Sequence, residues 1–473
     1  MDITLDNRKL AGTVKVIQSK SFAHRIMLSA ALAEITSGAH TEVLLDNDSE
    51  DVRATKRVIV ALGSGEELLD CGESGTTFRF IVPICAAQGR REVTRFTGHG
   101  RLLQRPMGPL MEAMEAHGVS FEYEENALVC RGRLRADEYT IAANVSSQYI
   151  SGLLFALPLL DGDSVLNLTG TVESRPYIDI TLDVLKDFGI VIEEEAVEAG
   201  AGSQISGGSG GSAGEAPVSA RFKIPGGQVY RGPAQMEVEG DWSNTAFWLA
   251  AGAIGCSGAA CSAGGDCSGG AVCSAGGDCS AGGHDAVTVT GLNLNSVQGD
   301  KAILDVLRRF GAEVTEDAAS GSVTCSGPAD GSMLRGCDID VKDIPDAVPI
   351  VSVVAAAAAG VTRIYNAGRL RMKESNRLVT VAAMLTALGA KVEEGEDYLI
   401  IHGAGRSADG DEKTGYVSGI RPLQGGTVDG ANDHRIVMSA ATAAIICQEP
   451  VTILGAQAVN KSYPGFFEER ENL

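Results

Sequence analysis

The sequence predicts an α/β protein of about six similar units, divided between two domains. The chain has 473 residues, which is too long for one ordinary domain, and its hydrophobic content of 44% is enough for two sizeable cores. Two helical patterns recur along the chain, and short strands follow the second of them. Because helices and strands alternate, we expect each unit to contribute one buried helix and one surface helix.

In the first pattern, a polar or glycine-bearing turn leads into a helix of apolar and small residues. Each such helix is apolar nearly all round, so we expect it to be buried, with its polar first turn at an open edge. The unpaired N–H groups and positive dipole ends of several helices would then meet at one place, which favours anions. In chain order the turns and helices are Ser19–Arg25 with Ile26–Ala33, Gly72–Thr77 with Phe78–Ala87, Asn144–Gln148 with Tyr149–Leu160, Glu239–Asn244 with Thr245–Ile254, Lys342–Asp346 with Ala347–Ala359, and Asp433–Arg435 with Ile436–Ile446.

In the second pattern, an amphipathic helix ends in glycine, and in four cases a short alternating strand follows directly. The glycine supplies a left-handed cap that releases the chain from the helix. The predicted segments are Ala54–Gly63, Pro109–Gly118 with strand Val119–Tyr123, Ile180–Gly189 with strand Ile190–Glu193, Ala302–Gly311 with strand Ala312–Thr315, and Val379–Gly389 with strand Ala390–Glu393.

Charge and hydropathy exclude several classes of protein. The formal net charge of −22 argues against nucleic-acid binding, although local Lys and Arg clusters can still hold small anions. The N-terminus lacks the apolar run of a signal peptide, and the most apolar segment, Val348–Val361, is too short to cross a bilayer. We therefore expect a soluble, cytoplasmic protein that binds no nucleic acid and no membrane.

The cysteines predict neither a disulfide framework nor a metal site. Six of the 11 are scattered without metal-ligand spacing, as expected for reduced thiols. The other five recur in a low-complexity tract at 256–283, where a zinc site is conceivable, but a flexible surface insertion fits better because no His or zinc-type turn accompanies them. A Gly/Ser-rich tract at 199–214 is interpreted as a second insertion.

The stretch Arg371–Arg377 concentrates charges where a helix begins. Arg371, Lys373 and Arg377 could bind phosphate or carboxylate, and Glu374 between them could move a proton. The alternative is a solvated helix start with an i, i+3 ion pair between Glu374 and Arg377. Likewise, polar residues at other helix starts could be ordinary N-caps, which include Ser146, Ser147, Asp241 and Asp433.

Ten short motifs in a fixed order make the chain resemble the 5-enolpyruvylshikimate-3-phosphate synthases. The resemblance runs from about Val14 to Phe467, without the two low-complexity tracts. The motifs are Ser19-Lys-Ser with Arg25, Gly72-x-Ser-Gly-Thr, Arg105-Pro, Ser146-Ser-Gln, Ser174-x-Pro-Tyr, Gly240-Asp, Ile344-Pro-Asp, Arg371-x-Lys-Glu-Ser-x-Arg, Asp433-His-Arg and Lys461-Ser-Tyr-Pro.

This resemblance implies a fold of two similar domains, each of three βαβαββ units with buried helices, known as an inside-out α/β barrel. The active site of the family lies between the domains. Residues 1–19 and 241–473 would form a discontinuous domain that carries phosphoenolpyruvate-side and catalytic residues. Residues 20–240 would form the shikimate 3-phosphate-side domain.

The implied reaction transfers the enolpyruvyl group of phosphoenolpyruvate to the 5-hydroxyl of shikimate 3-phosphate and releases phosphate. We expect a monomer that needs no cofactor and no metal, since clustered cations can neutralise both substrates. The implied shikimate 3-phosphate ligands are Lys20, Ser21, Arg25, Ser146, Ser147, Gln148, Ser174, Tyr177, Asp346 and Lys373. The implied phosphoenolpyruvate ligands are Lys20, Gly75, Arg105, Gln148, Arg377, Arg435 and Lys461.

Lys20 would touch both substrates and is counted with the catalytic residues. By the same resemblance, Asp346 would act as the base, aided by Lys373. Either Glu374 or Lys461 would donate a proton to the enol methylene, and the sequence leaves that choice open.

Two substitutions and two rival functions qualify the resemblance. Glu73 stands where many relatives have Asn, and Asn376 stands where Asp is usual. A sister enzyme uses UDP-N-acetylglucosamine as acceptor, but the Lys20-Ser21 and Arg105-Pro106 pairs favour shikimate 3-phosphate. A non-catalytic anion-binding protein is less fitting, because binding alone requires no acid and no base.

Overall fold

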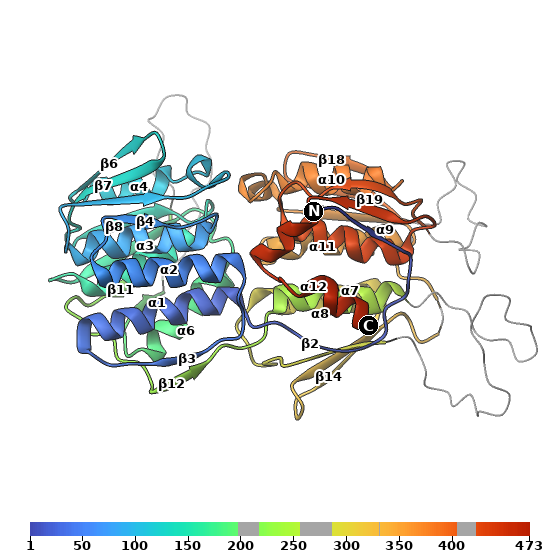
Figure 1. Cartoon of the computed structure of the whole chain (residues 1–473), viewed down its shortest axis with the longest axis horizontal. Coiled ribbons are helices and arrows are strands. Elements are labelled where there is room, and N and C mark those ends of the chain that lie inside the picture. Colours follow the sequence, from blue (N-terminus) through green and yellow to red (C-terminus); the bar gives the residue numbers. More distant parts are fainter. Residues whose placement is uncertain (197–216, 256–285, 331, 404–421) are drawn as a thin grey trace, which may run out of the picture. The chain divides into compact units, whose positions relative to one another are not determined.

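The computed structural model describes residues 1–196, 217–255, 286–330, 332–403 and 422–473 (Figure 1). The chain forms two compact units: unit 1 comprises residues 1–17, 240–296 and 300–473, and unit 2 comprises residues 18–239 and 297–299. Both low-complexity tracts, 199–214 and 256–283, lie outside the described residues, and so do the five cysteines of the second tract.

Unit 2 contains six α-helices and three sheets among its described residues. The helices are α1 (Lys20–Ser37), α2 (Glu50–Ser64), α3 (Gly75–Gln88), α4 (Gly108–Glu115), α5 (Ser147–Ala156) and α6 (Arg175–Asp187), with short 3₁₀ helices η1 (Leu102–Gln104) and η2 (Leu157–Leu159). The strands are β3 (Glu42–Leu44), β4 (Leu68–Asp70), β5 (Val93–Thr97), β6 (Val119–Glu124), β7 (Ala127–Gly132), β8 (Glu138–Ala142), β9 (Ser164–Thr169), β10 (Glu193–Glu195), β11 (Val218–Ile224) and β12 (Gln235–Glu237).

Unit 1 likewise contains six α-helices and three sheets among its described residues. Its helices are α7 (Trp242–Gly255), α8 (Ile303–Phe310), α9 (Val348–Ala357), α10 (Arg377–Ala387), α11 (His434–Ala443) and α12 (Phe466–Asn472), with η3 (Gly299–Ala302), η4 (Pro345–Ala347), η5 (Gly368–Met372), η6 (Ala444–Ile446) and η7 (Ala456–Lys461). Its strands are β1 (Ile3–Leu5), β2 (Gly12–Lys15), β13 (Val287–Thr290), β14 (Glu313–Asp317), β15 (Ser322–Ser326), β16 (Asp338–Asp340), β17 (Val361–Tyr365), β18 (Lys391–Glu394), β19 (Leu399–His402), β20 (Gly426–Asp429) and β21 (Val451–Leu454).

The strand pairing follows the expected βαβαββ order in four of the six sheets. These sheets run β4-β5-β7-β6 and β10-β11-β9-β8 in unit 2, and β14-β15-β13-β2 and β16-β17-β19-β18 in unit 1. In each sheet, the two strands that come first in the chain pair in parallel, and the two that come last pair antiparallel. The two remaining sheets are shorter: β12 pairs with β3, and β1 pairs antiparallel with β21 beside β20.

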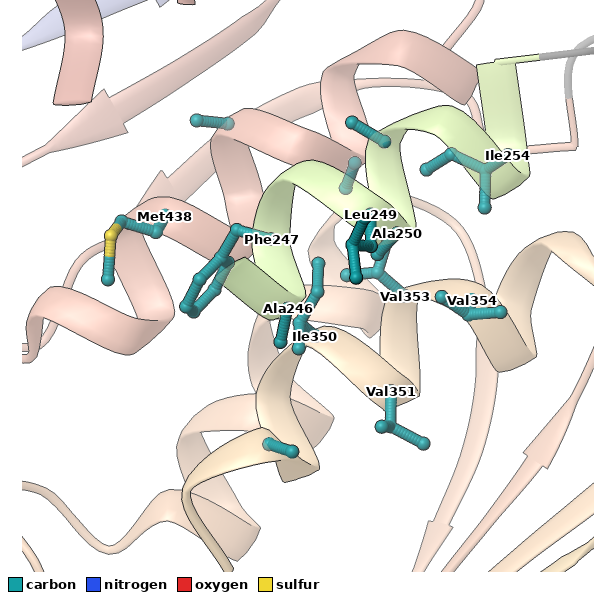
Figure 2. Packing of buried hydrophobic residues seen from close by; sticks show 14 of the residues in the cluster. Ala246, Phe247, Leu249, Ala250, Ile254, Ile350, Val351, Val353, Val354 and Met438 are labelled. Carbon is teal, nitrogen blue, oxygen red and sulfur yellow. The ribbon is translucent and has the colours of Figure 1, made fainter. Parts of the chain in front are cut away.

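All six predicted apolar helices form and are buried, namely α1, α3, α5, α7, α9 and α11. In α7, for example, every residue is buried. Figure 2 shows how Phe247 and Ala250 of α7 pack beside Ile350 and Val353 of α9, with Met438 of α11 nearby. Burying each of the larger side chains, such as Phe247, Ile350 and Val353, contributes roughly 1.5–3 kcal/mol. Helices without a charged or strongly polar face therefore form the centre of each unit, and their polar groups are concentrated in the first turns, with single buried hydroxyls such as Ser151 and Ser352 further along.

The five amphipathic helices also form, although several boundaries differ from the predicted ones. Helix α6 begins at Arg175, before the predicted Ile180, and α4 ends at Glu115, before Gly118. Helix α2 continues past Gly63, and Gly65 is its left-handed cap, with φ of 84°. The strand predicted at 190–193 begins only at Glu193 as β10. Gly189, Gly311 and Gly389 do adopt positive φ after their helices, as expected from the pattern.

Candidate active site

A single buried guanidinium, that of Arg377, organises the polar residues of unit 1. Arg377 begins α10, and its side chain is only 1% exposed. Its Nε donates to Asp433 Oδ2 at 2.8 Å, Nη1 to Asp346 Oδ1 at 2.7 Å, and Nη2 to Glu374 Oε2 at 2.6 Å. The planar fork of donors holds three carboxylates that would otherwise repel one another.

Asp346 lies in η4 and contacts two further cations. Lys373 Nζ is 3.2 Å from Oδ1, and Arg435 Nη2 is 3.6 Å from Oδ2. Burial alone would raise the pKa of Asp346, but Lys373, Arg435 and Arg377 outweigh that effect and hold the pKa well below its usual value. Burial lowers the pKa of Lys373, and the carboxylate of Asp346 opposes that shift. Asp346 is therefore ionised and surrounded by cations.

Arg435 lies in the first turn of α11, and Lys461, the last residue of η7, reaches the turn that precedes this helix. Asp433 caps this helix, because its Oδ1 accepts from the backbone N–H of Arg435 at 3.0 Å. Arg435 Nη1 donates to the backbone carbonyl of Ser243 at 3.3 Å, and Lys461 Nζ donates to the carbonyl of Asn432 at 2.9 Å. We call Asp346, Lys373, Glu374, Arg377, Asp433 and Arg435, with Lys461 in the adjoining turn, the carboxylate–cation cluster.

Arg371 is directed away from this cluster, although it belongs to the same sequence motif. Its guanidinium donates to the carbonyls of Gly395 and Glu396 and lies 2.8 Å from the carboxylate of Glu394. These residues belong to the end of β18 and the turn before β19. We therefore leave Arg371 out of the anion-binding set that the sequence suggested.

In unit 2, Arg25 is a buried cation whose hydrogen-bond partners among the described residues are all uncharged. It lies in the second turn of α1 and is 2% exposed. Its guanidinium donates to Thr181 Oγ1 at 2.8 Å, Ser151 Oγ at 3.4 Å, and the carbonyls of Ser21 and Tyr177 at 2.7 and 2.9 Å. Burial lowers its pKa to about 9. A buried guanidinium held only by neutral oxygens is well prepared to bind an anion.

Lys20 is the first residue of α1 and precedes Ser21 and Arg25 in the sequence. Unlike Arg25, it has an acidic partner. Its Nζ lies 2.8 Å from Asp51 Oδ2, and both side chains are 14% exposed. An anion that binds Lys20 would have to share the positive charge of the ammonium group with Asp51.

The starts of α3 and α5 bring Gly75, Arg105 and Gln148 together. A Cβ atom on Gly75 would lie 2.5 Å from Arg105 Nη1, so the glycine permits the guanidinium to approach the helix N-terminus. Gln148 donates to Thr76 Oγ1 at 2.8 Å and accepts from Arg79 Nη1 at 2.6 Å. Backbone N–H groups, an amide and two guanidinium groups thus gather at two adjoining helix starts.

The remaining predicted residues of unit 2 lie at the starts of α5 and α6. Ser146 caps α5 by accepting from the N–H of Gln148, and Ser147 is buried at the first helical position. Ser174 precedes α6 in the left-handed conformation, with φ of 53°, and is buried. Tyr177 is in the first turn of α6, and its carbonyl accepts from Arg25.

Arg175, between Ser174 and Tyr177, is committed to acidic partners. Its guanidinium makes two bonds to Glu194, at 2.6 and 2.7 Å, and one to Asp179 at 2.6 Å. These ion pairs occupy its donors, so we leave Arg175 out of the cations proposed to bind substrates.

Several residues of these clusters were not singled out from the sequence. Asp51, Ser151 and Thr181 lie inside ordinary helices, and nothing in their local pattern distinguishes them. Asp300 and Ser243 are both buried and hydrogen-bonded to each other. A polar turn before α8 was the one signal that could have drawn attention to Asp300.

The described residues contain no group of three or more His, Cys, Asp or Glu side chains arranged to hold a metal ion. No helix in the described part of the chain is long and apolar enough to cross a membrane.

Solved structures place the fold among the enolpyruvyl transferases. An EPSP synthase from Acinetobacter baumannii has a TM-score of 0.70 at 22% identity and covers 100% of this chain and 98% of its own. The enolpyruvyl transferase NikO from Streptomyces tendae has a TM-score of 0.68 at 16% identity and covers 100% of this chain and 96% of its own. At such identities the likeness concerns the fold alone.

Sequence comparison identifies the family within this class. A family model described as EPSP synthase (3-phosphoshikimate 1-carboxyvinyltransferase) matches residues 6–257 and 266–469. A 3-phosphoshikimate 1-carboxyvinyltransferase of Clostridium acetobutylicum is 36% identical over 485 residues, spanning 98% of this chain and 95% of that protein. The chain belongs to the EPSP synthase family.

Proposed function

We propose that this protein transfers the enolpyruvyl group of phosphoenolpyruvate to the 5-hydroxyl of shikimate 3-phosphate, as a 3-phosphoshikimate 1-carboxyvinyltransferase of the shikimate pathway. The observation that carries the proposal is the carboxylate–cation cluster. In it, an ionised aspartate, a lysine, a glutamate and two arginines are in contact at the positions of the family motifs. Such a set supplies both anion ligands and proton carriers, which binding alone would not require.

The cations divide between the two substrates. Arg25 at the start of α1, with Ser21, Ser146, Ser147, Ser174 and Tyr177, would bind shikimate 3-phosphate. Arg105, Arg377, Arg435 and Lys461, with the N-terminus of α3 at Gly75, would bind phosphoenolpyruvate. Gln148 would contact both ligands, and so would Lys20 once an anion competes with Asp51. On this division, unit 2 carries the shikimate 3-phosphate ligands together with Gly75 and Arg105, and unit 1 carries the other phosphoenolpyruvate ligands and the catalytic residues of the cluster.

The addition step requires one proton to leave and another to arrive. Asp346, aided by Lys373, accepts the proton of the 5-hydroxyl as its oxygen attacks C2 of phosphoenolpyruvate. Glu374 or Lys461 gives a proton to the C3 methylene, which becomes a methyl group. In the elimination step these roles reverse: Glu374 or Lys461 takes a proton back from that methyl group, the C2–O bond to phosphate breaks, and Asp346, aided by Lys373, gives its proton to the departing phosphate.

Further features of the proposal follow from the sequence. The protein would act in the cytoplasm as a monomer, with no nucleic-acid or membrane partner. It would need no cofactor, because the cations named above neutralise the phosphates and carboxylates of both substrates.

Phosphate release measures the proposed reaction directly. The purified protein is incubated with phosphoenolpyruvate and shikimate 3-phosphate, and UDP-N-acetylglucosamine replaces the acceptor in a parallel reaction. We expect turnover with shikimate 3-phosphate alone. Turnover only with the nucleotide sugar would transfer the protein to the sister activity, and turnover with neither would leave a non-catalytic anion-binding protein.

The variant Asp346→Ala tests the chemistry of the cluster. It should lose turnover by roughly three or more orders of magnitude but keep shikimate 3-phosphate binding, measured by calorimetry. Asp397→Ala, on the hairpin near Arg371 and outside the cluster, is the matched control. A wild-type rate for Asp346→Ala would remove this residue from the mechanism.

A further inference from the structure

Asp300 is a buried acid that the proposed reaction does not use. It lies in η3 just before α8 and is 3% exposed. Its carboxylate accepts a hydrogen bond from Ser243 Oγ at the start of α7. Burying a carboxylate is costly unless the charge has a compensating role or partner, so its position requires an explanation.

A continuous series of contacts joins Asp300 to the carboxylate–cation cluster. Ser243, held by Asp300 through its hydroxyl, offers its backbone carbonyl to Arg435 Nη1 at 3.3 Å. The other terminal nitrogen of Arg435 is 3.6 Å from Asp346 Oδ2. Asp300 thus fixes one of the groups that hold the Arg435 guanidinium.

The charge of Asp300 also acts on its neighbours. The pKa of Asp300 is raised to about 6, chiefly by burial and also by the nearby carboxylates of Asp346 and Asp241, while Arg435 and the Ser243 hydroxyl act in the opposite direction. These are the charged groups that face it from η4, α11 and the segment before α7. By reciprocity, an ionised Asp300 makes Asp346 hold a proton more readily than it would beside a neutral residue.

We propose that Asp300 is a positioning residue, which aims Arg435 at phosphoenolpyruvate through Ser243 and strengthens Asp346 as a base through its negative charge. This inference rests on the proposed function, since it assigns Arg435 and Asp346 the roles given above. Asp300 itself touches neither substrate.

The proposal has a pH signature that a purely structural residue would not give. Above pH 6 Asp300 is ionised and both effects operate; below pH 6 it becomes protonated and both weaken. Asp300→Asn keeps an oxygen for the Ser243 hydroxyl but is neutral at every pH. The wild-type and variant rates should therefore differ most above pH 6 and converge below it. Taking their ratio cancels the titration of the substrate phosphates, which also ionise in this range.

The experiment measures kcat and the KM of each substrate from pH 5 to pH 8 for the wild type, Asp300→Asn, Ser243→Ala and a control, Asp305→Asn. Asp305 is an exposed acid on α8, paired only with Arg308 among the described residues. At pH 7.5 we expect Asp300→Asn to lose roughly tenfold in kcat/KM for phosphoenolpyruvate while its KM for shikimate 3-phosphate stays within about twofold. The loss should shrink to less than about threefold at pH 5, and Asp305→Asn should match the wild type throughout.

Ser243→Ala separates the two effects, because it removes the hydrogen bond but keeps the charge. Its KM for phosphoenolpyruvate should rise, and its rate should retain the dependence near pH 6. If Asp300→Asn does not fold, this variant carries the test, and an unchanged KM for phosphoenolpyruvate overturns the inference. For a folded Asp300→Asn, a variant-to-wild-type ratio that is constant from pH 5 to pH 8 overturns it. Absence of wild-type turnover would instead reject the proposed function, and the inference with it.

Discussion

Replacing Arg377 by methionine should destabilise unit 1 by about 3 kcal/mol at neutral pH. The substitution keeps an apolar side chain of similar length in a site that is 1% exposed, but it removes the cation shared by Asp346, Glu374 and Asp433. Leaving one partner of a buried ion pair uncompensated typically costs about 3–5 kcal/mol. We take the lower end of that range because Lys373 and Arg435 still neutralise Asp346.

Tryptophan fluorescence in urea measures this loss in unit 1 separately from unit 2. The chain has two tryptophans, Trp242 and Trp248, and both are buried in α7 of unit 1. The signal therefore follows the unfolding of unit 1 even if the two units unfold at different urea concentrations. Urea is preferable to guanidinium chloride, because the salt would screen the ion pairs under test.

The effect of Arg377→Met should also depend on pH, with a sign set by Asp346. The folded-state pKa of Asp346 is well below its usual value, so its ion pairs add stability above about pH 4 and lose it as pH falls through the folded pKa. The variant lacks part of that contribution. The difference in the free energy of unfolding should therefore be largest at neutral pH and should shrink as pH falls below about 4.

The control is Arg308→Met on α8 of the same unit. Arg308 is 40% exposed and pairs with Asp305 and Glu316 at the surface, so its loss should change the stability by no more than about 1 kcal/mol. An Arg377→Met variant as stable as this control would refute the reasoning. So would a destabilisation that does not change between pH 7 and pH 3.

Three further substitutions test ligand binding, each through steady-state KM values. Gly75→Ala would place a Cβ atom 2.5 Å from Arg105 Nη1 and push the guanidinium away, so the KM for phosphoenolpyruvate should rise at least about tenfold with shikimate 3-phosphate unaffected; equal KM values would show that Arg105 does not bind there. Arg25→Lys keeps the charge but loses the fork, so the KM for shikimate 3-phosphate should rise roughly tenfold, whereas an unchanged value would assign Arg25 to structure alone. Arg175→Gln should alter neither KM by more than about threefold, because the donors of Arg175 are occupied by Asp179 and Glu194; a larger change would return it to the substrate-binding cations.

The buried helices could be predicted from the sequence because their apolar composition indicates that they must be buried. Helix α7 has no polar face, and such a segment can be stable only inside a domain. Boundaries were less certain where two glycines compete, as at the end of α2, where Gly65 and not Gly63 caps the helix. The late start of β10 has a similar origin, since Ile190–Ile192 alternate like a strand but do not pair in the described sheet.

The strand pairing of the two shorter sheets, β12-β3 and β1-β21-β20, could not be predicted from local patterns. Strands β12 and β3 are 190 residues apart in the chain and pair in parallel, and β1 pairs with β21 from the opposite end of the sequence. Nothing in a three-residue segment specifies such a partner. These pairings are set by where the longer helices place the strands.

Some residues of the candidate site could likewise be predicted from local sequence, whereas the roles of others depend on tertiary contacts. Residues at helix starts, such as Ser146 and Asp433, could be recognised because a capping position is visible in the sequence, and both do cap their helices. Which arginine pairs with an acid could not be predicted, because such a pair depends on contacts between distant segments. Arg175 finds Glu194 on β10, whereas Arg25 finds only uncharged oxygens.

The two interpretations of the Arg371–Arg377 stretch prove compatible once burial is considered. The ion pair between Glu374 and Arg377 exists at 2.6 Å, as the ordinary helix-start interpretation requires, but Arg377 is buried and holds two further carboxylates. A solvated pair would contribute little to stability or chemistry. In the buried cluster, an anion that binds Arg377 must compete with Glu374 and Asp346.

That competition offers a reason why a carboxylate with a low pKa can serve as a base. As long as Lys373, Arg435 and Arg377 all neutralise Asp346, its affinity for a proton is too low for efficient proton abstraction. If the phosphate and carboxylate of phosphoenolpyruvate draw Arg435 and Arg377 toward themselves, two of those three charges are shared, and the pKa of Asp346 must rise. The base would then become effective only when the group to be transferred is bound. The same redistribution would release Glu374 from Arg377 at the moment when a proton donor is required.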